Sequence, residues 1–219
     1  MIPLISVIIP VYNQEKFINR CIRSILNQTI DKSSYEVIVI DDCSDDNTDV
    51  LLSSFKKEIK IIKNKVNKGL PASLNIGIKK AMGKYIVRLD SDDYVHMDYL
   101  KIMSMALEMN TDFDAVSCDY IKVADNEEVI SRHNSDQDKI GCGIMFRQKH
   151  MIDIGLYNKD QLFNEEIEFR QRYEKKYKII RLPFTLYRYR MHETNMTKDK
   201  ENMNLYLKKI KAQKNDFRK

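Results

Sequence analysis

Nearly continuous apolar runs alternate with segments of helical spacing along the first half of the chain. Four such runs predict strands, at 4–11, 35–40, 59–62 and 85–89. Apolar residues spaced three or four apart, with capping and stop residues at their ends, predict helices at 14–28, 50–57, 72–82 and 98–109. Strands that are apolar on both faces and are separated by helices are typical of βαβ units. We therefore predict an α/β fold, Rossmann-like, with a mostly parallel sheet flanked by helices.

The pattern is weaker in the second half. Strands are predicted at 115–123, 128–131, 144–147, 178–182 and 186–189, and a helix at 165–175. Near the end, Met203, Tyr206, Leu207 and Ile210 form one apolar helical stripe in an otherwise basic segment. The prediction is one domain over 1–197, followed by a basic, partly amphipathic tail over 198–219.

Acidic residues stand where predicted strands end. Asp90, Asp92 and Asp93 follow the strand at 85–89, and the Asp41-Asp42 pair closes the strand at 35–40. Ligands of parallel sheets bind outside the carboxyl ends of the strands. In an extended backbone Asp90 and Asp92 project to one side and Asp93 to the other. Carboxylate oxygens suit Mg²⁺ or Mn²⁺, which commonly bridge to phosphates, so the pattern predicts a metal–diphosphate site.

Composition narrows the class of protein. The net charge of +5 resides entirely in 198–219, and residues 1–197 carry equal numbers of basic and acidic side chains, so a nucleic-acid-binding surface is not expected. The four cysteines have no C-x-x-C spacing, which favours reduced, buried thiols. We find no leader pattern and no apolar run of membrane-spanning length, and expect a cytoplasmic protein or one at the inner face of a membrane.

Five motifs occur together in order. They are Ser6-Val7-Ile8-Ile9-Pro10-Val11-Tyr12-Asn13, Val39-Ile40-Asp41-Asp42-Cys43-Ser44-Asp45-Asp46, Asn67-Lys68-Gly69, Asn75-x-Gly77 and Leu89-Asp90-Ser91-Asp92-Asp93. This set resembles the family 2 glycosyltransferases, which have the GT-A fold of nucleotide-diphospho-sugar transferases. The resemblance covers 4–95 closely and continues loosely to about 197.

The resemblance implies a metal-dependent, inverting transfer of a sugar from a nucleoside-diphosphate sugar, a UDP-sugar first among them, to a hydroxyl acceptor. Bacterial cell-surface polysaccharide or glycan assembly is the implied setting, with a saccharide or lipid-linked saccharide as acceptor and Mn²⁺ or Mg²⁺ as cofactor. The residues implied to bind the donor are Pro10, Tyr12, Glu15, Asp42, Asn67, Asp90 and Asp92. Asp92 is the implied metal ligand of the D-x-D motif. His192 is implied as a further metal ligand or as a hydrogen-bond donor to the diphosphate, because Arg190-Met191-His192 resembles the family's Arg-x-His segment, and a structural role for this histidine stays open.

The general base can be assigned to more than one residue. The family supplies it as the Asp of a Glu-Asp pair at the start of a late helix, and the matching position here is Glu166. Glu165 and Glu168 remain open alternatives, as does a purely structural role for a charged helix start. Arg88 stands inside an apolar strand, so we expect it to pair with Asp42 or with a neighbouring acid.

Two rival functions remain at this point. A non-catalytic, sugar-nucleotide-binding subunit of an assembly complex is favoured by the short second half and by Glu at the base position. A nucleotidyltransferase would want a glycine-rich loop after the first strand, where Tyr12-Asn13-Gln14-Glu15 stands instead. The tail is expected to be either a surface helix or a contact to an anionic membrane, and a homo-oligomer is left open.

Overall fold

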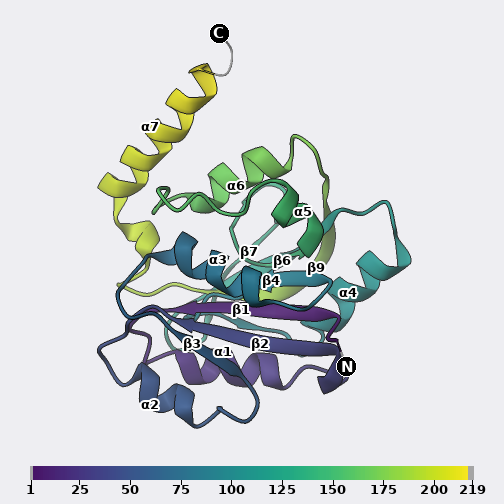
Figure 1. Ribbon diagram of the computed structural model, residues 1–219, viewed down its shortest axis with the longest axis vertical. Coiled ribbons are helices and arrows are strands. Elements are labelled where there is room, and N and C mark those ends of the chain that lie inside the picture. Colours follow the sequence, from purple (N-terminus) through teal and green to yellow (C-terminus); the bar gives the residue numbers. More distant parts are fainter. Residues whose placement is uncertain (1, 217–219) are drawn as a thin grey trace.

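The computed structural model describes residues 2–216, and its centre is a nine-stranded sheet (Figure 1). In spatial order the strands are β3 (Lys60–Lys63), β2 (Tyr35–Asp41), β1 (Ile5–Val11), β4 (Tyr85–Arg88), β8 (Ile144–Arg147), β6 (Ala115–Val123), β9 (Ile179–Arg190) and β5 (Tyr94–Val95), with β7 (Val129–His133) pairing with β6. Strands β1, β2, β3, β4, β6 and β9 run in one direction, and β5, β7 and β8 run against their neighbours. The predicted α/β fold with a mostly parallel sheet is confirmed.

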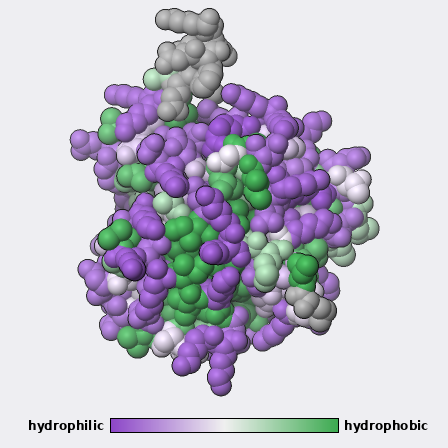
Figure 2. Space-filling view, in the orientation of Figure 1, coloured by the Kyte–Doolittle hydropathy of each residue, from purple (hydrophilic) through white to green (hydrophobic). Residues whose placement is uncertain are grey.

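Helices cover both faces of this sheet. Helices α1 (Ile18–Leu26), α2 (Thr48–Ser53) and α4 (Tyr99–Met109) pack in one hydrophobic cluster with the side chains of one face. Helices α3 (Leu70–Lys80), α5 (Gln148–Asp153) and α6 (Glu165–Tyr173) pack in a second cluster on the other face. The outer surface is mainly hydrophilic, with some hydrophobic side chains exposed in the middle of the face seen in Figure 2.

The alternation of side chains in β1 explains the two clusters. Ile5, Val7 and Ile9 belong to the first cluster and Ile8 to the second, and all four are fully buried. Helix α3 approaches the second face closely at Gly77, where a Cβ would lie 2.5 Å from Ile8 Cγ2. Burying a branched aliphatic side chain stabilises the fold by about 1.5–3 kcal/mol, so this doubly covered strand is a main source of stability.

The structure differs from the sequence prediction in a few elements. The strands predicted at 178–182 and 186–189 are one strand, β9, whose register against β6 shifts between the Cys118–Leu182 and Asp119–Thr185 pairs. Pro183 lies in this shift, which fits a residue that cannot donate a ladder hydrogen bond. Helix α5 and the two-residue strand β5 were not predicted, because both are too short to show a period. The tail contains a 3-10 turn over Met196–Lys198 and helix α7 (Lys200–Asp216).

All four thiols are free, and three of them are buried as expected. Cys21, Cys118 and Cys142 are buried, and Cys43 is exposed. None of the helices in residues 2–216 combines the length and the apolar character that crossing a membrane requires.

Candidate functional site

A cavity of about 830 Å³ lies at the carboxyl ends of β1, β2 and β4. The segments that follow these strands, the loop before α3, the start of α6 and the beginning of α7 all contribute to its wall. Of the residues singled out from the sequence for the donor, metal and base sites, those that line it are Pro10, Tyr12, Asp42, Asn67, Asp90, Asp92, Glu165 and Glu166, and Arg88 lines it as well. The polar segments that follow β1, β2 and β4 therefore meet at one edge of the sheet, as expected for parallel strands.

Asp42 is buried at the end of β2 and does not cap α2. Its Oδ1 accepts hydrogen bonds from Asn64 Nδ2 at 2.7 Å and from the backbone N–H of Lys68 at 2.9 Å. Its Oδ2 accepts from the backbone N–H of Gly69 at 2.8 Å. Gly69 has φ of +82°, a conformation that suits glycine. Asp42 thus holds the Asn67–Gly69 loop against the cavity.

Asp90 is bound to Arg88. The guanidinium Nε donates to Asp90 Oδ1 at 2.5 Å and Nη2 donates to Oδ2 at 3.1 Å. Arg88 also donates from Nη1 to Glu165 Oε1 at 2.7 Å. The buried arginine therefore pairs with a neighbouring acid, as expected, and with Glu165; Asp42 is not its partner.

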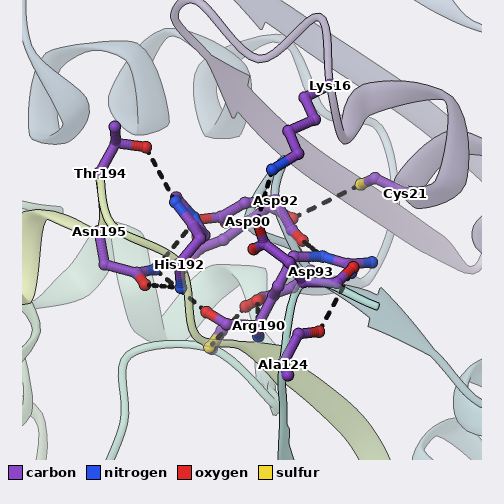
Figure 3. Close-up of polar contacts among 12 residues, drawn as sticks. Lys16, Cys21, Asp90, Asp92, Asp93, Ala124, Arg190, His192, Thr194 and Asn195 are labelled. Carbon is purple, nitrogen blue, oxygen red and sulfur yellow. Dashed lines mark hydrogen bonds and ion pairs between the residues drawn. The ribbon is translucent and has the colours of Figure 1, made fainter. Parts of the chain in front are cut away.

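Asp92 lies beside His192 (Figure 3). His192 Nε2 and Asp92 Oδ2 are 2.9 Å apart, and Asn195 Nδ2 donates to the same oxygen at 3.5 Å. Among the described residues none donates to Asp92 Oδ1, and Asp92 lines the cavity, so one carboxylate oxygen is available to a ligand. An ion bound by both Asp92 and His192 would replace their hydrogen bond. An oxygen and an imidazole nitrogen suit Mn²⁺, so these two residues fit the predicted metal.

Asp93 points away from the cavity, but strand alternation is not the reason, because the expected extended backbone ends at Arg88. Residues 90–93 form a turn in which the backbone N–H of Asp93 donates to the C=O of Asp90 at 3.0 Å. The Asp93 carboxylate accepts from Tyr187 OH and from the backbone N–H of Arg190, both at 2.7 Å.

Asp90, Asp93 and Cys142 lie close enough to suggest a second metal site. However, burial raises the pKa of the Cys142 thiol well above its usual value, and Asp93 is already hydrogen-bonded. Sulfur is also not among the ligands that Mg²⁺ and Ca²⁺ prefer, so this cluster fits a hard cation less well than the carboxylate and imidazole of Asp92 and His192 fit Mn²⁺.

The three glutamates at the start of α6 have different surroundings. Glu165 is buried and paired with Arg88, and Glu168 is paired with Arg172 at 2.6 Å. Glu166 forms no ion pair with any described residue, and it lines the cavity. The helix begins after Asn164, whose φ of +56° places the first turn beside the cavity. Of the three carboxylates left open by the sequence, Glu166 is the one that is both in the cavity and unpaired among residues 2–216.

The pKa of Glu166 is raised to about 7. Burial is the main cause, and the neighbouring Glu165 carboxylate adds to it, whereas Arg88 acts in the opposite direction. A carboxyl with this pKa is ionised in part of the molecules at neutral pH and can accept a proton there. An ordinary glutamate has a pKa near 4.5 and is a weaker base.

Two residues to which the sequence analysis gave a role in binding the donor or the metal, Glu15 and His192, do not line the cavity. Glu15 accepts from the backbone and side-chain N–H groups of Asn47, at 2.9 and 2.7 Å, and so joins the loop after β1 to the start of α2. The donor-binding role assigned to it is not supported by this placement. His192 lies behind Asp92, between it and Thr194.

Sequence reasoning missed several residues of the wall. Gly141 packs so closely that a Cβ there would lie 2.8 Å from Glu166 Cβ. Asn195 holds Asp92, and Met203 of α7 lines the cavity. None of them belongs to a recognisable motif.

The tail is less peripheral than its composition suggests. Asn164 Nδ2 donates to the backbone C=O of Met203 at 2.7 Å, and the rings of Phe163 and Tyr206 are 5.6 Å apart. Ile210 is buried. The predicted apolar stripe is confirmed as the less exposed side of α7, and it contacts the segment that precedes α6.

A family model described as "Glycosyl transferase family 2" matches residues 6–167. This chain belongs to that family. An uncharacterized glycosyltransferase of Haemophilus influenzae is 31% identical to it, over 95% of this chain and 76% of the relative. The poly(ribitol-phosphate) beta-glucosyltransferase of Bacillus spizizenii is 44% identical over 100 residues, which are 44% of this chain and 16% of that protein. This chain thus spans only a small part of some curated relatives.

Solved structures support the GT-A fold. The structure of S. aureus TarS 1-349 in complex with UDP-GlcNAc superposes with a TM-score of 0.80 at 21% identity, covering 94% of this chain and 65% of that one. The mannosyltransferase PcManGT from Pyrobaculum calidifontis, in complex with GDP-Man and Mn²⁺, gives 0.75 at 17% identity, covering 97% and 64%. At these identities the likeness establishes the fold alone.

Proposed function

We propose that this chain is an inverting glycosyltransferase that moves a sugar from a nucleoside-diphosphate sugar to a hydroxyl acceptor. The observation that carries the proposal is the position of Glu166 in the same cavity as Asp42, Asp90 and Asp92. Its carboxylate has a pKa of about 7 and forms no ion pair with the residues that the structure describes. A binding subunit needs the strand-end acids only. A transferase also needs a base, and Glu166 meets that need.

The donor is proposed to lie along the strand ends. Asp42 would accept from the nucleobase, with Pro10, Tyr12 and Asn67 beside it, and Asp90 would approach the ribose. Charged acceptors make strong hydrogen bonds and discriminate between bases. A Mn²⁺ or Mg²⁺ ion held by Asp92, with His192 beside it, would supply positive charge that stabilises the diphosphate as leaving group. A UDP-sugar is the first donor to test, since UDP and UDP-GlcNAc occupy structures of TarS.

The base acts on the acceptor. The Glu166 carboxylate takes the proton of the acceptor hydroxyl, and the oxygen forms a bond to the anomeric carbon on the side opposite the diphosphate. The bond from that carbon to the diphosphate breaks, and its electron pair leaves with the nucleoside diphosphate. Attack from the opposite side inverts the configuration at the carbon. A saccharide or polyol of a cell-surface polymer is the proposed acceptor, because relatives act on poly(ribitol-phosphate) by name.

A nucleotide-release assay tests the proposal. The chain is incubated with a panel of UDP-, GDP- and dTDP-sugars, with and without Mn²⁺, in the presence of pooled saccharide and polyol acceptors. We expect release of one nucleoside diphosphate that depends on acceptor. If a donor binds but no acceptor leads to release, the binding-subunit alternative replaces the enzyme.

Asp92→Asn should weaken Mn²⁺-dependent UDP binding at least about tenfold without unfolding the protein. Mutating a residue that only supports a metal ligand usually lowers metal affinity about 10–100-fold, and Asp92 would be a ligand itself. Its side chain lines the cavity and is not core, so the unfolding midpoint should stay close to that of the parent. Calorimetric titration with UDP and Mn²⁺ measures the affinity. Unchanged Mn²⁺-dependent affinity would remove Asp92 from the site.

Deleting 199–219 should lower kcat/KM for the acceptor about tenfold or more. The deletion removes Met203 from the cavity wall and leaves Asn164 without its hydrogen-bond acceptor. Met203 is half-buried at this wall, and each 1.36 kcal/mol of transition-state stabilisation that is lost lowers the rate about tenfold. Deleting 213–219 alone is the control, since it keeps Met203, Tyr206 and Ile210. Equal activity of both truncated chains would make the tail peripheral, and its membrane contact would then be the role to test.

A further inference from the structure

We propose that Arg88 is a positioning residue, which joins the donor-binding Asp90 to the first turn of α6 and thereby holds Glu166 in the cavity. The proposal rests on the proposed function, because it assigns Arg88 a task in that reaction. Arg88 touches no reacting atom itself; it acts through Asp90 and Glu165.

Arg88 occupies a position that would suit an apolar residue. It is the last residue of β4, two positions after Ile86, and its neighbours in space include Ile8, Leu74 and Tyr157. Its side chain is only 11% exposed. A buried, charged side chain at such a position is costly, and an apolar residue of similar size is often equally stable or more stable. Stability alone therefore does not account for an arginine here.

The three hydrogen bonds of Arg88 connect two distant parts of the chain. Nε and Nη2 hold both oxygens of Asp90, and Nη1 holds Glu165, which is 77 positions away in sequence. Arginine presents its N–H groups in a rigid, planar arrangement, so fixing one carboxylate also fixes the direction of the other. The start of α6, which lies above β4 in Figure 1, is thus placed relative to the donor-binding loop.

Glu166 follows Glu165 directly in the chain. The hydrogen bond from Arg88 to Glu165 therefore also determines where the backbone of Glu166 lies. Gly141 closes the arrangement from the other side, since a Cβ there would lie 2.8 Å from Glu166 Cβ and 3.0 Å from Arg88 Nη1. The Gly141 backbone therefore packs on both residues. The reaction rate depends strongly on the position of the base relative to the acceptor. A displacement of a catalytic group by about 1 Å can lower the rate about 10²-fold.

The charges around Glu166 are few. Glu165 from α6, Arg88 from β4 and Asp90 from the loop after β4 face it, and Tyr157 packs nearby as a neutral group. Lys139 lines the same cavity, but it is paired with Glu174. Arg88 therefore has a second effect on the base: it offsets the two neighbouring carboxylates that favour the protonated form of Glu166.

The test compares Arg88→Met, Glu165→Gln and Glu168→Gln with the parent. The readouts are kcat, donor affinity and the acid limb of the kcat/KM profile, which reports the base in the free enzyme. We expect both Arg88→Met and Glu165→Gln to lower kcat at least about tenfold. The acid limb should move about one unit to higher pH in Arg88→Met, since two carboxylates lose their counter-charge. In Glu165→Gln it should move to lower pH. Glu168→Gln, whose pair with Arg172 lies outside the cavity, should leave all three readouts unchanged.

Arg88→Met leaves two buried carboxylates without a partner and could fail to fold. The double variant Arg88→Met, Glu165→Gln then takes its place, with one fewer buried charge. We expect it to fold and to keep the low kcat, because the connection between Asp90 and α6 is still missing. Recovery of the parental kcat in the double variant would show that Arg88 only neutralises Glu165, and would overturn the proposal.

The outcomes separate this proposal from the proposed function. If the parent transfers sugar and the Arg88 and Glu165 variants keep its kcat and acid limb, the positioning role is wrong and the function stands. If the parent transfers nothing, the function fails. The pKa of Glu166 can then be measured without substrate, from carboxyl NMR of the parent and the same variants, and shifts of equal sign in Arg88→Met and Glu165→Gln would overturn the proposal.

Discussion

Glu166→Gln should reduce the turnover number about 10²–10⁴-fold, the usual range for loss of a general base. Glutamine keeps the size of the side chain and cannot take the acceptor proton. Donor affinity should stay nearly unchanged, because the donor is proposed to lie along the ends of β1, β2 and β4 and makes no demand on this carboxylate. Single-turnover kinetics with saturating donor measures the chemical step separately from binding.

Glu168→Gln is the matched control for this prediction. It is the same substitution in the same turn of α6, at a carboxylate that is paired with Arg172 and does not line the cavity. We expect turnover close to that of the parent. Near-normal transfer by Glu166→Gln would remove Glu166 as the base, whatever the control shows.

The raised pKa of Glu166 should also be visible in stability. Its ordinary value is 4.5 and its folded value is about 7, so the folded chain holds the proton more tightly than the unfolded chain does. This stabilisation is fully present below about pH 4.5 and is lost as the pH rises to about 7. At 1.36 kcal/mol per pKa unit the loss amounts to about 3 kcal/mol. Glutamine does not titrate, so Glu166→Gln should gain about this much stability relative to the parent between pH 4 and pH 8.

Urea unfolding of both proteins at pH 4 and pH 8 measures this difference. A single change of about 3 kcal/mol in the relative free energy of unfolding is large for a domain whose total stability is of order 5–15 kcal/mol. Equal pH dependence in the two proteins would mean that Glu166 has an ordinary pKa, and the account of a poised base would lose its support. Acid residues elsewhere affect both proteins alike and cancel in the comparison.

The strands and the acids at their ends could be predicted from sequence, because short, continuous stretches of the chain contain the pattern that identifies them. Apolar runs such as 35–40 mark buried strands, and the topology of parallel sheets then brings Asp42 and Asp90 to one edge. The choice of Glu166 over Glu165 and Glu168 could not be made in this way. It depends on Arg88 and Arg172, and Arg88 lies 77 positions from its partner Glu165.

Other features were missed for a similar reason. Glu15 belongs to the motif region after β1, yet its carboxylate turns to Asn47 and not to the cavity. Helix α7 has the composition of a solvated basic tail, and its approach to the site is visible only from the contacts of Met203 with Asn164 and of Tyr206 with Phe163. Long-range contacts of single side chains leave no periodic pattern in the sequence, so they become visible only in the fold.

A thermal-shift titration with nucleoside diphosphates tests the central claim most directly, because it asks whether the strand-end cavity binds the leaving group of the proposed reaction. The parent and Asp92→Asn are heated with UDP, GDP and dTDP, each with Mn²⁺ and with a chelator. A ligand at 100 times its dissociation constant adds about 2.7 kcal/mol of stability. We predict that one nucleotide, UDP first, stabilises the parent by this amount with Mn²⁺. Asp92→Asn, whose affinity should be at least about tenfold weaker, should gain no more than about half as much. Absence of stabilisation by every nucleotide, or equal stabilisation of both proteins, would contradict the account.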